Sequence, residues 1–90
     1  MLKLPAVMTH AVAVGCTQDL KKVVHAEAGP VVVTDASALR EFDSSALAVL
    51  LACRREALAL GKTLAVQGLP ERLRQLAQLY GVAELMPAPA

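Results

Sequence analysis

Residues 31–55 read VVVTDASALREFDSSALAVLLACRR and contain the pattern that decides the fold. The run Val31–Thr34 is β-branched throughout, which is typical of a central strand in a parallel sheet that helices cover on both faces. We expect a short crossing loop over residues 36–42 and then a helix over about Ser44–Leu60. Gly61 stands where a left-handed residue commonly ends a helix.

The start of this helix carries three polar residues in a row. Asp43, Ser44 and Ser45 stand ahead of the first apolar residues, where backbone N–H groups without intrahelical partners favour short polar side chains as caps. From Ala46 to Cys53 the helix has no polar residue on any face, although packing on a sheet needs an apolar stripe of only about 100°. We therefore expect other helices or a partner protein to cover the remaining apolar surface.

The segment before the first glycine-proline pair predicts a strand and a helix. Residues Leu2–Met8 favour a strand, and Pro5 places it at a sheet edge because proline has no N–H to donate. Thr9 can cap a following helix whose apolar residues recur at helical spacing, namely Val12, Cys16, Leu20, Val23 and Val24. The alternation in His10–Cys16 supports a second strand as the alternative.

The C-terminal third predicts one more strand and one more helix. Lys62–Gln67 alternates like a strand, and Pro70 suits the first turn of a helix over Glu71–Leu79. The buried stripe of that helix is expected to comprise Leu73, Leu76, Ala77 and Tyr80. Residues 82–86 could pack back on the domain, and the last four residues should fray.

This order, β-α-β-α-β-α, predicts a single α/β domain over residues 1–90, with a small parallel or mixed sheet covered by helices. Of the 90 residues 56 % are hydrophobic, but only Phe42 and Tyr80 are aromatic, so the core must consist of Ala, Val and Leu. The formal net charge of +1 argues against nucleic acid as a partner. No apolar run approaches the roughly 20 residues of a membrane span, and we see no secretory leader, so we expect a cytoplasmic protein.

Side chains that could take part in catalysis or bind a metal are few and scattered along the sequence. Cys16 and Cys53 lie in helical patterns without CxxC spacing, so we expect them to be reduced core residues. His10 and His25 have no carboxylate or thiol at ligand spacing, and the glycines form no phosphate-binding motif. The acids Asp35, Glu41 and Asp43 are interpreted as caps and helix-dipole partners. We therefore expect no enzyme activity, no metal and no cofactor.

The two serines carry the stronger functional signal. Ser44 and Ser45 could serve as helix caps alone, or as a docking or phosphorylation point. A phosphate at a helix N-terminus is favoured by the dipole, but beside Asp43 and within an apolar interface it would repel a partner. Both interpretations can hold together.

These residues resemble a known family, the STAS domain. The resemblance covers about 50 residues in three parts: a strand followed by Asp-Ser-Ser-Ala-Leu at a helix start, then GKTLAVQGLP, then a helix ending Leu-Tyr-Gly-Val. The chain departs from the family at Ala46, where glycine is common, and in an N-terminus that looks shorter by one strand. The resemblance implies a STAS-like α/β fold and a role in protein–protein interaction.

Two kinds of STAS domain are similar to this chain. Anti-sigma-factor antagonists resemble it through the Asp-Ser-Ser motif, which places their phosphorylated serine on Ser45. The small STAS subunit of Mla-type phospholipid-transport ABC systems resembles it more closely through Gln67-Gly68 and residues 76–80, and places the important hydroxyl on Ser44. That resemblance implies an adaptor that binds the transport ATPase at the inner membrane, without hydrolysing ATP, in a system that maintains outer-membrane lipid asymmetry.

The predicted partner surface centres on the serine turn. Its expected contact residues are Asp43, Ser44 and Ser45, extended by Arg40, Glu41, Ala48, Cys53, Arg54 and Arg55. The alternative function is an anti-sigma-factor antagonist switched by phosphorylation of Ser45. A homodimer through the same apolar helix face is a third hypothesis.

Overall fold

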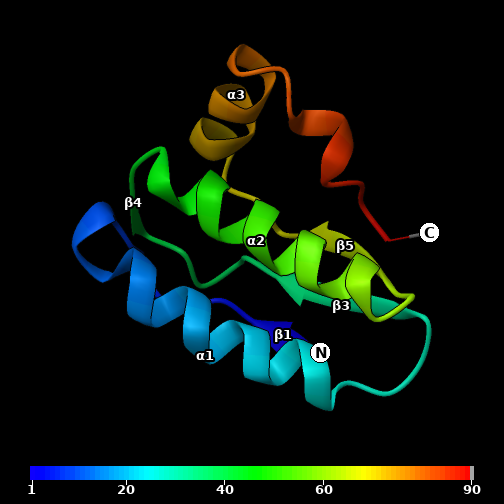
Figure 1. The fold of residues 1–90 in the computed structure, drawn as a ribbon. Helices are drawn as coiled ribbons and strands as arrows, with labels where there is room; N and C mark the ends of the chain where they lie inside the picture. Colours follow the sequence, from blue (N-terminus) through cyan, green and yellow to red (C-terminus); the bar gives the residue numbers. More distant parts are fainter. Residues whose placement is uncertain (90) are drawn as a thin grey trace.

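The computed structural model describes residues 1–89, and Figure 1 shows how their helices and strands are arranged. In chain order the elements are β1 (Leu2–Lys3), β2 (Val7–Met8), the 3-10 helix η1 (His10–Val12), α1 (Ala13–Ala26), β3 (Val31–Asp35), β4 (Glu41–Phe42), α2 (Ser45–Ala59), β5 (Thr63–Gln67), α3 (Glu71–Leu79) and the 3-10 helix η2 (Ala83–Leu85). The predicted α/β class is confirmed.

The main sheet has three parallel strands in the order β1-β3-β5, with β3 in the centre as predicted. Leu2 of β1 and Val66 of β5 are both register partners of Thr34. Because all three strands run in the same direction, their carboxyl ends lie at one edge of the sheet. The loops that follow β1 and β3 therefore start at this edge.

The predicted strand Leu2–Met8 is in fact two strands that belong to different sheets. Leu4 still donates its N–H to the carbonyl of Asp35 at 3.0 Å, but Pro5 has no N–H and the pairing ends there. The chain then forms β2, which pairs in parallel with β4 in a second, two-stranded sheet. Strand β4 lies inside the stretch predicted to be only a crossing loop, so that prediction was incomplete.

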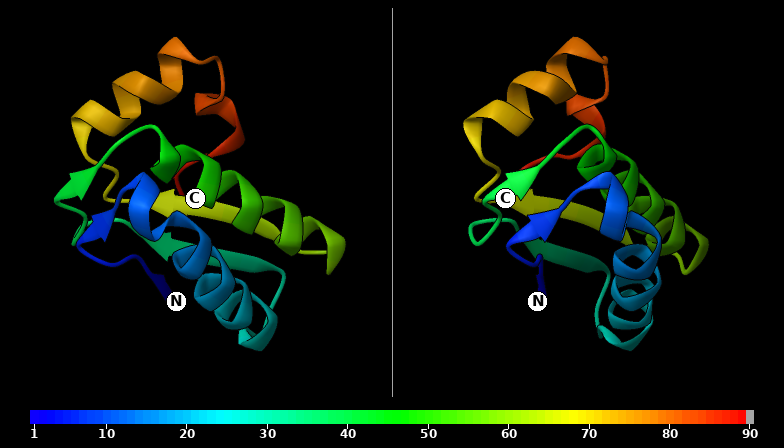
Figure 2. Two further views of the ribbon diagram at one scale, coloured as in Figure 1. Left: turned by 60° about the vertical axis from the view of Figure 1, so that its left-hand side comes forward. Right: turned by 90° about the vertical axis from the view of Figure 1, so that its left-hand side faces the viewer.

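The helix after Thr9 is confirmed as η1 and α1, and the alternative strand over His10–Cys16 is wrong. Helices α1 and α2 lie on the same side of the main sheet in both views of Figure 2. On that side β3 contributes Val32, which is fully buried. The prediction that helices cover β3 on both faces is wrong, since Val31 on the opposite face remains 47 % exposed.

Helix α2 ends as the sequence indicates. Gly61 has a φ of +73°, and Lys62 donates its N–H to the carbonyl of Ala57 at 2.8 Å, as in a Schellman motif. The side chain of Lys62 also reaches the last carbonyls of α1, including that of Val24 at 3.2 Å. One residue therefore ties together the C-terminal ends of both helices.

Helix α3 lies beyond α2 on the side away from α1 (Figure 1) and buries Leu73 and Ala77. Leu76 is half-buried, whereas Tyr80 is 58 % exposed and not part of the buried stripe. Tyr80 is the C-cap of α3 and still donates its N–H to the carbonyl of Leu76 at 3.0 Å, so the helix ends there with the ring at the surface.

The segment after η2 packs back on the domain, as predicted, and Met86 is its anchor. Met86 is buried in the core, and the carbonyl of Pro87 accepts the N–H of Val66 at 2.8 Å. The predicted fraying is therefore wrong at Pro87, while Ala90 lies outside the described residues.

Candidate functional site

The turn that opens α2 is organised by the carboxylate of Asp43. One oxygen, Oδ1, accepts the backbone N–H of Ser45 at 2.8 Å, and the other, Oδ2, accepts the backbone N–H of His10 at 3.0 Å. These bonds favour the ionised carboxylate and hold the pKa of Asp43 below its usual range, with the His10 amide as the largest cause. Asp43 therefore caps α2 and also binds the start of η1.

The serine hydroxyls do not perform the capping that the sequence suggested. Ser44 is already helical at φ −61° and ψ −17°, and within residues 1–89 its hydroxyl makes no capping hydrogen bond. Its side chain is exposed, and that of Ser45 is half-buried. The Ser44 hydroxyl is thus available to a partner while Asp43 stabilises the helix start.

The neighbouring residues Arg40 and Glu41 are held by their backbone. Both donate their N–H groups to the carbonyl of Ala6, at 2.8 and 2.9 Å. Their side chains are exposed, so the backbone fixes the loop and leaves both charges at the surface beside the Asp43 turn. Arg72 of α3 stacks over Phe42 of β4 at 5.8 Å from the ring centroid, which attaches the same loop to α3.

The predicted contact residues on α2 do not all share one face. Ser44, Ala48 and Arg55 are exposed, and their spacing of four and then seven residues keeps them on one stripe of the helix. Arg54 is half-buried and lies to one side of this stripe. Cys53 is fully buried against the sheet side of α2, so the expectation that it extends the contact surface is wrong.

A groove between α1 and α2 extends the exposed stripe. It has a volume of about 320 Å³ and is lined by Ala13, Val14, Thr17, Gln18 and Lys21 from α1 and by Ala48 and Val49 from α2. Val14 is 74 % exposed, which is unusual for a large apolar side chain. Sequence reasoning missed the α1 half of this surface, although Val14 was visible as an apolar residue outside the predicted stripe of α1.

At the opposite end of the two helices, His25 of α1 meets Glu56 of α2. Nε2 of His25 and Oε1 of Glu56 lie 2.5 Å apart, and this hydrogen bond is the main cause of a lowered pKa for Glu56. Asp43 therefore joins the two helices at one end, and the His25–Glu56 pair joins them at the other.

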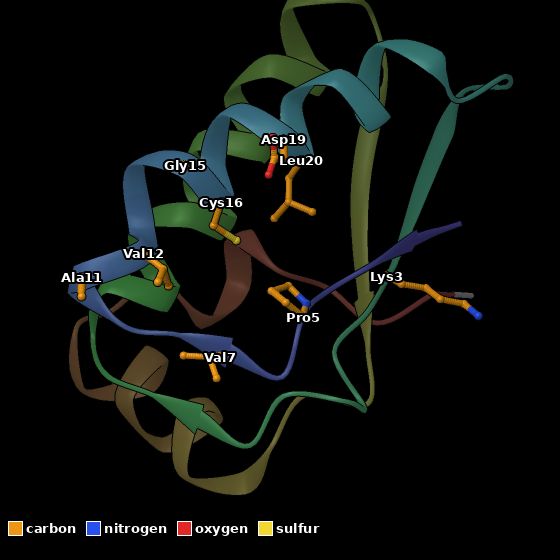
Figure 3. A pocket seen from close by; sticks show the side chains of 9 residues that line it. All are labelled: Lys3, Pro5, Val7, Ala11, Val12, Gly15, Cys16, Asp19 and Leu20. Atoms are coloured by element: carbon orange, nitrogen blue, oxygen red, sulfur yellow. The ribbon is translucent and has the colours of Figure 1, made fainter.

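A second hollow lies on the other side of α1 (Figure 3). It has a volume of about 630 Å³ and lies between α1 and the β1–β2 segment, with Pro5, Val7 and Leu20 among its apolar lining residues. Cys16 also lines it, and burial raises the pKa of its thiol. Burial raises the pKa of Cys53 to about 11, so both residues favour the unreactive thiol form.

Among residues 1–89 no group of three or more His, Cys, Asp or Glu side chains lies close enough together to hold a metal ion. The helices found in those residues are all too short or too polar to cross a membrane. Both cysteines are free.

Three parallel strands with two helices packed side by side on one face, both running in the direction opposite to the strands, and an Asp-Ser-Ser turn at the start of the second helix define a STAS-like domain. Comparison with protein families agrees, since the family model described as "Mlab, STAS domain" matches residues 1–87. This chain therefore belongs to the MlaB-type STAS family. Domains of this kind act as adaptors through protein–protein interaction. A comparison with curated proteins found no match.

Proposed function

We propose that this protein is a non-enzymatic cytoplasmic adaptor that binds the ATPase subunit of a Mla-type phospholipid-transport ABC complex. It would associate with the inner membrane only through that complex and would need neither a cofactor nor nucleic acid. The observation that carries the proposal is the family match over residues 1–87, taken together with the exposed serine turn.

The surface around Ser44 supports a protein partner. The exposed Ser44 lies one helical turn before Ala48, and Ala48 of α2 and Val14 of α1 line a shallow groove. Small and apolar side chains of this kind allow close packing of a partner's helix, and the exposed Arg55 further along the stripe supplies a charge at the rim. A partner would therefore contact α1 and α2 at once.

The test is co-expression of this chain with the candidate transport ATPase, followed by co-purification and measurement of the ATPase rate. Ser44→Glu places a charge on the proposed contact surface and should abolish binding. Gln75→Glu is the matched control, because Gln75 is also an exposed helical residue and the change in charge is the same, but on α3. Gln75→Glu should bind like the wild type.

Three results would contradict the proposal in different ways. A wild-type chain that does not bind the ATPase would exclude the transporter function. Loss of binding by Gln75→Glu as well as Ser44→Glu would show a nonspecific effect of charge. Binding by Ser44→Glu at the wild-type level would place the contact surface away from the serine turn.

An anti-sigma-factor antagonist switched by phosphorylation is the second candidate, because Ser45 lies in the first turn of α2, where the helix dipole favours a phosphate. Its amide already binds Asp43, whose carboxylate would repel a dianion. Incubation with the candidate kinase and mass spectrometry of Ser45 would test this function. A stable homodimer by light scattering would instead favour the third hypothesis.

A further inference from the structure

We infer that Asp43 is a positioning residue that sets the α1 and α2 halves of the partner surface relative to each other. This inference rests on the proposed function, because it assigns a role within the same surface. Asp43 was predicted as a contact residue, but both of its carboxylate oxygens are already bonded within the chain. In addition to any direct contact, it acts on a partner through the two segments that it joins.

The bridge connects residues that are far apart in sequence. His10 precedes Asp43 by 33 positions and begins η1, which leads directly into α1. The bond to its N–H fixes where α1 starts relative to the first turn of α2. Because Val14 lies only one turn further along α1, its position opposite Ala48 depends on this start.

The chemistry of the bridge requires a carboxylate. An ionised aspartate offers acceptors on both oxygens, whereas the asparagine side chain has one acceptor oxygen and one NH₂ donor. Asparagine caps helices about as well as aspartate, so it can keep the bond to Ser45. It would then present a donor to the N–H of His10, and the bridge would be lost while the cap remained.

The effect on binding follows from preorganisation. A partner that contacts both helices binds more weakly if it must first bring them into register, since that ordering reduces the observed affinity. The His25–Glu56 pair holds the far ends of α1 and α2, and the β2–β4 pairing ends at Met8 and Phe42, so without the bridge the two helix starts beyond that pairing lose a direct link. The loss should therefore appear in partner affinity more than in the fold.

The experiment compares three single variants of the full chain, and the double variant of Asp43→Asn with His10→Pro, by calorimetric titration with the candidate ATPase. Asp43→Asn removes the acceptor, and His10→Pro removes the donor. Proline fits this position because His10 is the first residue of η1 and Thr9 before it is extended at φ −99° and ψ 171°. His10→Ala is the control, because it removes the imidazole but keeps the N–H.

Asp43→Asn and His10→Pro should each raise Kd by roughly fivefold or more, and the double variant should be no weaker than the weaker-binding single variant. His10→Ala should bind like the wild type. Circular dichroism and thermal melting establish that each variant folds, and His10→Pro alone tests the bridge if Asp43→Asn does not fold.

Two outcomes separate this inference from the function on which it rests. Wild-type affinity in both Asp43→Asn and His10→Pro, or an equal loss in His10→Ala, would overturn the bridge and leave the adaptor function intact. A wild-type chain that does not bind the ATPase would overturn the adaptor function, and with it any role of Asp43 in binding.

Discussion

Replacing Thr34 by valine should stabilise this protein. Thr34 is fully buried on the helix-covered face of β3, and among residues 1–89 its Oγ1 finds no hydrogen-bond partner. A buried polar group without a partner costs about 1–3 kcal/mol relative to the unfolded chain, where water binds it. Valine has nearly the same shape and carries no hydroxyl, so the substitution removes this cost without leaving a cavity.

The expected gain at the lower end of that range, about 1 kcal/mol, corresponds to an increase in Tm of about 4–8 °C in a domain of this size. Urea unfolding followed by circular dichroism measures the gain, provided that the m value stays unchanged. Thr34→Ser is the control, because it keeps the hydroxyl and removes a methyl group worth about 0.8 kcal/mol or more. It should therefore be less stable than the wild type.

A Thr34→Val variant that is no more stable than the wild type would refute this reasoning. It would mean that the hydroxyl is satisfied, by an enclosed water or by a backbone carbonyl of the helix above it. Partner binding should not change in either variant, since Thr34 has no exposed surface.

Three further predictions concern the turns, the bridge and the thiols. Gly68→Ala should lower the free energy of unfolding, measured with urea, by more than Gly61→Ala. Both glycines have a positive φ, but only a Cβ at Gly68 would meet Ser37, at 3.0 Å. Equal losses of stability in the two variants would exclude a steric effect. The amide signals of His10 and Ser45, which bind Asp43, should shift together in an NMR pH titration, with a midpoint below the ordinary aspartate pKa. The stability that Asp43 contributes is complete above about pH 3.9 and is lost as the pH falls through the lowered pKa of the folded state. A midpoint above the ordinary aspartate pKa would contradict this prediction. Iodoacetamide should modify Cys53 only as fast as the chain unfolds, because this thiol is fully buried; rapid alkylation of the folded chain would argue against that burial.

Local sequence patterns predicted most of the regular elements because their causes are local. The β-branched run correctly predicted that β3 is the central strand. Gly61 ends α2 because glycine easily adopts the positive φ found there. The two short strands β2 and β4 gave no such signal. Each has only two residues, and they pair across more than thirty positions of the chain, so no local pattern contains them.

The candidate site was predictable in its centre and not in its extent. The Asp-Ser-Ser turn and the resemblance to the family were visible in the sequence, and Asp43 and Ser44 of this turn are exposed. The exclusion of Cys53 and the addition of Val14 required the structure. Helix α2 is apolar on every face from Ala46 to Cys53, so its sequence could not indicate which face packs on the sheet.

The sequence by itself determined the order of the three α-helices and of the strands of the main sheet, the helix boundaries at Asp43 and Gly61, and the family. These depend on backbone preferences and on spacings within one segment. Only the tertiary structure decided that both main helices cover one face of the sheet, and that Asp43 binds the amide of His10. Such contacts join residues that are distant in sequence, and their geometry exists only once the chain has packed.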